Sequence, residues 1–466
     1  MNGWSPNSPL DGLPFMKDAI NGGINMRKIL LIIGSLLLVA LVSACGSNNE
    51  GGNAGDNTNQ SSSDQTLTVL VEGGSPAQTV ADLTKEMFEE NTGYEVIIES
   101  VPYSGIYDRM RTELTSGTGA FDVATIDTIW LPALYQGLEP IQEMITDEMQ
   151  DDLFPGLIDG ASMNGNVYGL PTWTNSKILL YREDLFNDSN NQDEFLDEFG
   201  YELSPPETWD QYKDVAIFFG NNENYPELYG TSVFGATSGD SVASWLDHVA
   251  QAGAEALVID EAGEVIVNDD DHVAALEFLN DLVNEEGVVP EGVLETASAE
   301  TSELFYNGNL AMMLAWGHFY VPSNDPDTSK VAGDVSAAPM IAGDGGIGVV
   351  PGPWYQVIPA SSEKKDIAKE YLLFLYENNH LYADALGVAA RQSVFEEYGQ
   401  KEAFAHLNEL ATTLNGEQTQ NRPSTDKWEE IESEALLPAV QNVLSGSQTP
   451  QEALNDAKEI IEGIVN

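Results

Sequence analysis

Five of the eight tryptophans in this chain lie beside loop-forming residues, at the end of a predicted strand or the start of a predicted helix. They are Trp130, Trp173, Trp245, Trp316 and Trp354. Core aromatic residues more often lie in the middle of an element, so this placement predicts an aromatic-lined cleft. A pyranose ring needs flat aromatic surface for its C–H face and fixed polar partners for its hydroxyl groups. The pattern favours a carbohydrate site, with ordinary core packing as the alternative for any single tryptophan.

Polar residues that suit such a site stand close to these tryptophans in the sequence. Asp127, Asn175 and Gln356 are the candidates. A sugar hydroxyl that bonds a buried carboxylate is favourable, whereas an unpaired one is costly, and this difference provides selectivity. A phosphorylated ligand is disfavoured because the candidate site contains almost no lysine or arginine.

Motifs of catalysis and metal binding are not found. The chain has no P-loop, GxSxG, HExxH or EF-hand loop, and its five histidines lack the spacing of metal ligands. Residues 343–348 match GxGxxG, but Val349-Val350-Pro351 is a poor helix start, so we reject a phosphate site there. The acidic run 268–272 is interpreted as the cap and first turn of a helix, rather than as a cation site. We therefore expect a binding protein without cofactor or metal, and not an enzyme.

The net charge is −58 at pH 7, which disfavours nucleic acid or an anionic membrane surface as a partner. The chain is nonetheless 42% apolar, which predicts a globular protein and not a disordered acidic polymer. We interpret the acidity as the adaptation of an exported surface to high salt or to alkaline surroundings. A polycationic ligand is the competing explanation.

The first part of the globular region alternates strand and helix patterns. Strands are predicted at 66–71, 94–100 and 121–126. The helix between the first two has Val80, Leu83, Met87 and Phe88 on one face. A second helix carries Ile106, Met110 and Leu114. This βαβαβ order implies a parallel sheet with right-handed crossovers.

Farther along, Tyr168–Tyr181 reads as a long strand that is interrupted by Pro171 and passes from one lobe to another. A second crossing is predicted at 354–359. Thr208 and Gln211 have capping-box spacing at a helix start. We also expect a hairpin at 257–267, a helix at 271–284, a strand at 310–315 and helices from Lys364 to the end.

The N-terminal part carries a predicted export signal. Residues 26–44 combine Arg27 and Lys28 with an apolar stretch and small residues before Cys45, as in a lipoprotein signal peptide. Cys45 is the only cysteine, so no disulfide forms within the chain. We expect Cys45 to be lipidated, 45–65 to be a flexible tether, and 1–25 to be untranslated or a mis-assigned start.

Several short motifs follow one another along the chain, and their order and spacing are informative together. They are 88–93 (FEENTG), 114–123 (LTSGTGAFDV), 168–171 (YGLP), 180–186 (LYREDLF), 206–209 (PETW), 330–333 (KVAG) before Ala338-Pro339, and Arg422-Pro423 before Trp428. Together they resemble the family 1 extracellular solute-binding proteins of bacterial ABC importers, the group that includes maltose-binding protein.

This resemblance implies an α/β, two-lobed, type II periplasmic-binding-protein-like fold with a ligand cleft between lobes that hinge strands join. The implied N-terminal lobe is 66–171 plus 355–405, and the C-terminal lobe is 172–354 plus 406–466.

The same resemblance implies a set of ligand-binding residues. Asp127 and Trp130 match first-lobe sugar contacts, and Asn175 falls where maltose-binding protein has a carboxylate. The other implied positions are Gly74 in the first-strand loop, Trp245, Trp316 and Trp354. Trp173 and Tyr355 complete the set of expected ligand-binding residues. Arg391 is open between a salt bridge and a ligand contact, and Trp209 and Trp428 are weaker matches.

The expected function is that of a monomeric receptor that delivers a sugar, oligosaccharide or polyol to an ABC permease and its ATPase by hinge closure. It would be anchored through Cys45 on the extracellular face of the membrane, or be periplasmic. The first alternative is a receptor for a cationic solute such as a polyamine, which four or more acids converging on the cleft would support. A surface glycosidase or adhesin is the other alternative.

Overall fold

The computed structural model describes residues 65–73 and 76–466, all of which belong to one unit of the chain. The predicted signal peptide, Cys45, the tether and Gly74 lie outside the described residues. Among the helices of the described part, none is both long enough and apolar enough to cross a membrane.

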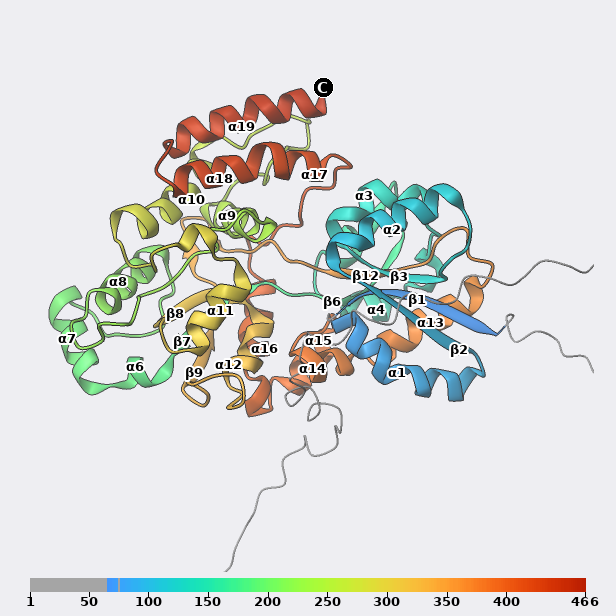
Figure 1. The fold of residues 1–466 in the computed structure, drawn as a ribbon, viewed down its shortest axis with the longest axis horizontal. Coiled ribbons are helices and arrows are strands. Elements are labelled where there is room, and N and C mark those ends of the chain that lie inside the picture. Colours follow the sequence, from blue (N-terminus) through green and yellow to red (C-terminus); the bar gives the residue numbers. More distant parts are fainter. Residues whose placement is uncertain (1–64, 74–75) are drawn as a thin grey trace, which may run out of the picture. The chain divides into compact units, whose positions relative to one another are not determined.

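A five-stranded sheet has the strand order β2-β1-β3-β12-β6 (Figure 1). Its strands are β1 (Thr66–Glu72), β2 (Glu95–Val101), β3 (Val123–Asp127), β6 (Gly169–Trp173) and β12 (Trp354–Val357). Strands β1, β2 and β3 run parallel, whereas β12 is antiparallel to both β3 and β6. The predicted parallel βαβαβ unit is confirmed, and a distant segment, β12, is inserted beside it.

A three-stranded antiparallel sheet has the order β8-β7-β9. Its strands are β7 (Lys177–Arg182), β8 (Met312–Trp316) and β9 (Val335–Ala338). Two short hairpins, β4 (Ser162–Met163) with β5 (Asn166–Val167) and β10 (Ala342–Gly343) with β11 (Gly346–Ile347), complete the described strands. The GxGxxG sequence forms the second of these hairpins and no helix follows it directly, so its rejection as a phosphate loop agrees with the fold.

Helices surround both sheets (Figure 1). Those before residue 260 are α1 (Pro76–Thr92), α2 (Tyr103–Ser116), α3 (Leu131–Leu134), α4 (Asp147–Asp152), α5 (Leu157–Gly160), α6 (Glu183–Asn187), α7 (Ser189–Phe199), α8 (Trp209–Gly220) and α9 (Gly239–Ala252). The later ones are α10 (Asp270–Asn280), α11 (Ser298–Tyr306), α12 (Tyr320–Ser323), α13 (Lys365–Glu377), α14 (His380–Leu386), α15 (Gln392–Tyr398), α16 (His406–Leu414), α17 (Trp428–Ile431), α18 (Leu437–Leu444) and α19 (Pro450–Val465).

We call the five-stranded sheet with α1, α2 and α13 the first lobe, because these helices pack on its strands. The three-stranded sheet with α6, α11 and α16 is the second lobe, and α9, α10, α18 and α19 pack on one another beside it. The connection between the two sheets after β6 is only three residues long, Thr174–Ser176.

Helix α1 corrects one sequence prediction. Val80 and Phe88 are buried as expected, but Leu83 and Met87 are 48% and 43% exposed. The buried face instead includes Thr84, whose hydroxyl donates to the Val80 carbonyl oxygen at 2.7 Å. Threonine at this position satisfies its polar group within the helix, so it packs inward while the two larger side chains face outward.

The predicted long strand 168–181 is interrupted, but not at Pro171. Pro171 lies inside β6, opposite Tyr355 of β12, and the interruption falls at Thr174–Ser176. The predicted hairpin at 257–267 is reduced to a single bridge between Ile259 and Val265. Thr208 caps α8 as predicted and accepts from the Gln211 backbone N–H at 3.3 Å.

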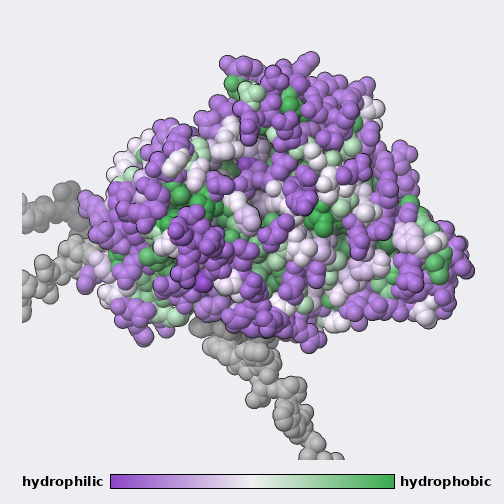
Figure 2. All heavy atoms as spheres, turned by 180° about the vertical axis from the view of Figure 1, so that it is seen from behind, coloured by the Kyte–Doolittle hydropathy of each residue, from purple (hydrophilic) through white to green (hydrophobic). Residues whose placement is uncertain are grey.

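Hydrophilic residues cover most of the face seen in Figure 2, with smaller hydrophobic patches among them. This distribution fits the high acidic content of the chain, because charged side chains remain in water unless they are paired.

Candidate functional site

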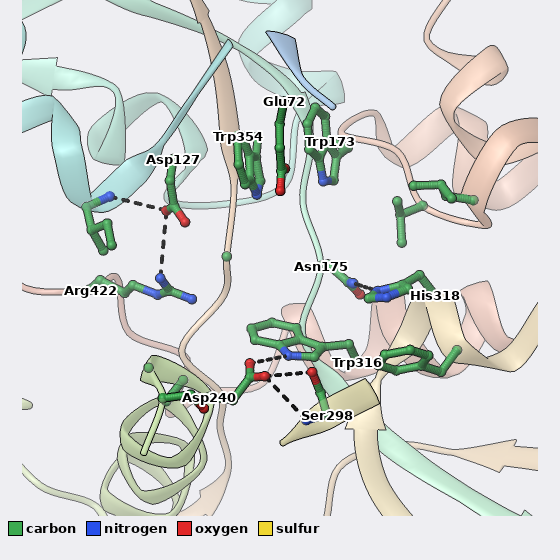
Figure 3. Close-up of a pocket in the computed structure, with 18 of the residues that line it drawn as sticks. Glu72, Asp127, Trp173, Asn175, Asp240, Ser298, Trp316, His318, Trp354 and Arg422 are labelled. Carbon is green, nitrogen blue, oxygen red and sulfur yellow. Dashed lines mark hydrogen bonds and ion pairs between the residues drawn. The ribbon is translucent and has the colours of Figure 1, made fainter. Parts of the chain in front are cut away.

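A cavity of about 490 Å³ is lined by residues from both lobes (Figure 3). This volume lies in the range of small-molecule sites. Its lining residues are Glu72, Asp127, Ile129, Trp173, Asn175, Ser238, Gly239, Asp240, Ala243, Ser298, Trp316, His318, Phe319, Gly352, Trp354, Leu386, Val388, Arg422 and Glu432.

The first wall of the cavity is one edge of the five-stranded sheet. Glu72, Asp127 and Trp173 are the last residues of β1, β3 and β6, and Trp354 is the first residue of the antiparallel β12. Trp354 pairs with Asp127 on one side and with Trp173 on the other. The strand register therefore sets these side chains side by side at the carboxyl ends of the parallel strands, where α/β sheets commonly bind ligands.

Two tryptophans form a stacked pair in this wall. The rings of Trp173 and Trp354 have centroids 5.2 Å apart and planes inclined by 13°. Trp173 also stacks on Tyr382, and Trp354 meets the edge of Trp130 at 6.0 Å. These neighbours hold the pair in place, so the part of the Trp354 ring that remains exposed is preformed.

Trp316 belongs to the opposite wall in Figure 3 and ends β8. Its indole Nε1–H donates to Asp240 Oδ1 at 3.1 Å. The other oxygen of Asp240 accepts from the Ser298 hydroxyl at 2.6 Å. Asp240 lies in the first turn of α9, where a carboxylate is favoured by the helix dipole. Asp240, at the start of α9, thus fixes the ring of Trp316. Ser298, at the start of α11, in turn holds Asp240.

A buried ion pair packs against the ring of Trp316. Lys177 Nζ lies 2.8 Å from Asp247 Oδ2, and both side chains are 1% exposed. The same ammonium group lies 4.2 Å from the centroid of the Trp316 ring. Asp247 Oδ1 also accepts from the Val350 backbone N–H at 2.7 Å. The Lys177 ammonium therefore contacts both a carboxylate and the Trp316 ring, and the carboxylate also pairs with a backbone N–H. Buried charges require such partners.

Asn175 and His318 form a neutral polar contact at the side of the cavity. Asn175 Nδ2 lies 2.7 Å from His318 Nδ1, and Asn175 Oδ1 accepts from the Ser176 backbone N–H at 3.0 Å. Burial lowers the pKa of His318 to about 4, so the ring is neutral at pH 7. With Nδ1 accepting from the amide, the proton of His318 is on Nε2 and is available for donation.

The charges in the cavity are mostly negative. Four carboxylates line it, against one guanidinium, that of Arg422, which lies 3.7 Å from Asp127 Oδ1. Burial and the charge of Asp127 raise the pKa of Glu72 to about 7. Burial, Glu429 and Asp127 raise the pKa of Glu432 to about 7, although Arg422 opposes the rise. Within the described part of the chain, no three histidine, cysteine or acidic side chains come together as metal ligands.

The structure brings Asp127, Trp173, Asn175, Trp316 and Trp354 together in the cavity, and it places three other predicted site residues elsewhere. Trp130 is 2% exposed, and its Nε1–H donates to Glu429 at 3.3 Å. Trp245 lies in the core, where its Nε1–H donates to the His272 carbonyl. Tyr355 is fully buried behind the first wall and donates to the Leu157 carbonyl at 3.0 Å. These three do not line the cavity.

The weaker candidates also lie away from the cavity lining. Arg391 forms an ion pair with Asp152 at 2.6 Å, which accounts for its charge. Trp209 donates to Gln251 at 2.7 Å, Trp428 is buried, and Gln356 donates to the Thr125 hydroxyl.

Most lining residues were not among the sequence candidates, and those with acidic or imidazole side chains are Glu72, Asp240, His318 and Glu432. Glu72 carries a signal that was available, because it follows the predicted strand 66–71 just as Asp127 follows the strand 121–126. Asp240 and Glu432 have no such signal. They begin α9 and a π-helical turn, Glu432–Leu436, and only the packing of these elements brings them to the cavity.

Comparison with known proteins gives one family match. A model of the family described as "Bacterial extracellular solute-binding protein" matches residues 69–379.

Individual relatives and a solved structure are similar over most of their length. A probable ABC transporter-binding protein of Deinococcus radiodurans is 24% identical over 74% of this chain and 80% of its own. A mannitol-binding protein of Pseudomonas aeruginosa is 28% identical over 70% of this chain and 72% of its own. The maltose-bound protein MalE3 of T. maritima has a TM-score of 0.72 and 24% identity, covering 86% of this chain and 99% of that one. The predicted two-lobed fold is confirmed by this structural similarity.

Proposed function

The chain belongs to the bacterial extracellular solute-binding protein family, and on this basis we propose that it is a receptor for a sugar, an oligosaccharide or a polyol. The observation that carries the proposal is the combination of flat aromatic surface with fixed polar groups in one cavity. Trp354 and Trp316, which are partly exposed, offer surfaces for C–H faces, with Trp173 stacked against Trp354, and Asp127, Asn175 and His318 offer partners for hydroxyl groups. The names of the relatives, which include mannitol and maltose as ligands, support this choice.

The proposed mechanism is hinge closure without chemical change of the ligand. We divide the lobes at 66–173 plus 354–398 and 177–347 plus 406–466, with hinge segments at Thr174–Ser176, 348–353 and 399–405. The boundaries expected at 171/172 and 354/355 are moved so that all of β6 and β12 stays with the first lobe. A ligand that touches Trp354 and Trp316 at once stabilises the closed arrangement, to the extent that it binds this arrangement better than the open one. Contacts from the segment 421–429 already join the two lobes, among them Arg422 with Asp127, the Asn421 amide with the Gly156 carbonyl at 3.1 Å and Glu429 with the Trp130 indole at 3.3 Å.

The cellular setting follows from the family description, which places its members outside the cell. We propose that Cys45 carries a lipid anchor and that the partners are an ABC permease and its ATPase. The relative in D. radiodurans, named as a probable ABC transporter-binding protein, supports the partnership. The surface acidity would keep such an exposed domain soluble at high salt or high pH.

Calorimetric titration of the purified protein with neutral sugars, oligosaccharides and polyols tests the proposal. A ligand at a hundredfold excess over its Kd stabilises the fold by about 2.7 kcal/mol, so thermal unfolding gives a parallel reading. Binding with recovery of the unchanged ligand, together with a smaller radius of gyration by X-ray scattering, is the expected result. Turnover of the ligand, or binding without compaction, would contradict it.

One observation favours a second candidate, a receptor for a cationic solute. Four carboxylates, Glu72, Asp127, Asp240 and Glu432, line the cavity, which is the number that this alternative requires. Spermidine in the same titrations distinguishes the two candidates, because only the cationic-solute receptor would bind it without binding any carbohydrate.

A further inference from the structure

A segment of the second lobe crosses to the first lobe beside the cavity. Residues 415–427 connect α16 with α17 and form neither helix nor strand. Connections of this length without regular structure are uncommon in compact domains, and they are often functional where they occur. We call residues 418–429 the bridging segment, which includes the start of α17. Its contacts show which lobe holds it and which lobe it reaches.

The second lobe anchors both ends of the bridging segment. At its start, the Gln418 backbone N–H donates to the Ile347 carbonyl at 3.1 Å, and Gln420 Nε2 donates to the Ala254 carbonyl at 2.8 Å. At its end, Trp428 is buried and α17 packs on α19. The segment therefore belongs to the second lobe and follows that lobe when the lobes move.

Two side chains of the bridging segment contact the first lobe outside the cavity. The Asn421 amide donates to the Gly156 carbonyl at 3.1 Å, and Glu429 accepts from the Trp130 indole N–H at 3.3 Å. Both Asn421 and Glu429 are exposed, and neither lines the cavity. Their hydrogen bonds therefore join the two lobes without involving a ligand.

Gly156 allows the lobes to approach closely at this point. Its φ of +81° lies in the left-handed region, which side chains rarely adopt. A Cβ at this position would also lie only 3.1 Å from Asn421 Oδ1, so Asn421 would have to shift. The first lobe thus has a glycine where the bridging segment contacts it most closely.

Arg422 connects these contacts with the cavity. It follows Asn421 directly and lines the cavity, and its Nη1 lies 3.7 Å from Asp127 Oδ1 of the first lobe (Figure 3). Its Nη2 lies close to the hinge segment 348–353, since a Cβ on Gly352 would be 3.2 Å from it. One short segment therefore reaches the first lobe, the cavity and the hinge.

We propose that the bridging segment is a latch, in which Asn421 and Glu429 are positioning residues that hold the lobes closed and so raise the ligand affinity without touching the ligand. This inference rests on the proposed function, because it takes hinge closure around a ligand as given. Groups of the protein alone make the latch, so it forms whether or not ligand is bound. The apparent Kd equals the intrinsic Kd divided by the closed fraction, so loss of the latch weakens all closing ligands by one common factor.

X-ray scattering of the ligand-free protein tests the latch directly. The double variant Asn421→Ala with Glu429→Ala removes both hydrogen bonds, and it leaves the packing of each lobe intact because both side chains are exposed. Its radius of gyration should exceed that of the wild type. Glu430→Ala is the matched control, since Glu430 is exposed in the same helix and pairs with Lys427 of the second lobe. The control should keep the wild-type radius.

Calorimetry with mannitol, sorbitol, maltose and maltotriose tests the effect on affinity. Each of these that binds the wild type should bind the double variant more weakly by about threefold to tenfold, with the same factor for every ligand. Glu429→Gln keeps an acceptor oxygen for the Trp130 indole and should lose less affinity than Glu429→Ala. A loss of fold stability alone would lower the unfolding temperature and leave the affinities unchanged.

The outcomes separate the latch from the proposed function. An unchanged radius of gyration in the double variant, or unchanged affinities, would overturn the latch. Factors that differ between ligands would overturn it as well, because they would make Asn421 and Glu429 ligand contacts. If none of the four probes binds the wild type while the double variant expands, the latch stands and the carbohydrate receptor loses its support.

Discussion

The two walls of the cavity are built in different ways. The first wall is an edge of one sheet, where Asp127, Trp354 and Trp173 occupy paired positions on three neighbouring strands. The second wall is assembled from the end of β8, the first turns of α9 and α11, and a π-helical turn. Strand register and ring stacking position the first wall, whereas the second depends on hydrogen bonds between separate elements.

The interactions that support the tryptophans also differ between the two walls. In the first wall the tryptophans support each other by stacking. In the second wall the single ring of Trp316 is held by Asp240 above the buried pair of Lys177 and Asp247. We therefore expect polar substitutions to disturb the second wall more than the first.

Breaking the buried ion pair gives the largest expected effect. Lys177→Met leaves Asp247 as an uncompensated buried charge, which costs about 3–5 kcal/mol in the free energy of unfolding. Urea unfolding measures this loss. Lys177→Met combined with Asp247→Leu should recover part of the stability, because no charge is then left unpaired. A loss below 1 kcal/mol in the single variant would show that the second wall does not depend on this pair.

Removal of a stacked ring tests the first wall through binding. Trp354→Ala should weaken ligand binding by about 1–3 kcal/mol, in line with buried aromatic anchors. Calorimetry with the best ligand of the panel gives the value. Trp209→Phe is the control, because Trp209 packs on Phe278 and does not line the cavity. Equal affinity in Trp354→Ala and the wild type would remove the stacked pair from the site.

Asp240→Asn tests the hydrogen bond that holds Trp316. The substitution keeps the size of the side chain and removes its charge, so the bond from the indole becomes a neutral one and weakens by about 1 kcal/mol. We expect a several-fold loss of affinity and a shift of tryptophan fluorescence. Arg391→Gln, on the far ion pair with Asp152, should leave the affinity unchanged. If both variants bind alike, Trp316 does not need Asp240 for its orientation.

The smallest expected effect is the contribution of Glu432 to the pH dependence of the free energy of unfolding. Burial raises its pKa to about 7 in the folded protein, above the ordinary value of 4.5, so it favours folding at low pH, and this contribution is lost as the pH rises through 7. Glu432→Gln does not titrate, and its stability relative to the wild type should therefore increase between about pH 5 and pH 8.

Denaturant unfolding at both pH values measures this difference. The buried histidines His248, His318 and His406 have lowered pKa values and give the opposite trend, but they are present in both proteins and cancel. A difference that is constant with pH would contradict the raised pKa of Glu432.

The two walls also differ in how far the sequence predicts them. Asp127, Trp173 and Trp354 were predicted because a strand pattern ends or begins at each, and the end of a strand is visible in the sequence. The parallel order of β1, β2 and β3 follows from the same patterns. Trp316 was found in the second wall for this reason as well, since it ends β8.

The residues that were missed depend on contacts between distant elements. Asp240 meets Ser298 across 58 residues, and no local pattern encodes that meeting. Trp245 has the sequence surroundings of a site tryptophan, but α9 turns it into the core, where it is fully buried. Helical periodicity likewise misassigned Leu83, because it ranks Thr84 as polar and ignores the bond that its hydroxyl makes to Val80.

The insertion of β12 between β3 and β6 has a consequence for the order of folding. The Gln356 side chain bonds Thr125 across 231 residues of chain, whereas the sheet β8-β7-β9 is complete at Ala338. Until β12 is available, β3 and β6 have unpaired edges, which are prone to wrong pairing. Non-local pairing is also slow. The part of the protein that is synthesised first should therefore complete its sheet last, and a chain that stops before residue 354 should aggregate through the first lobe.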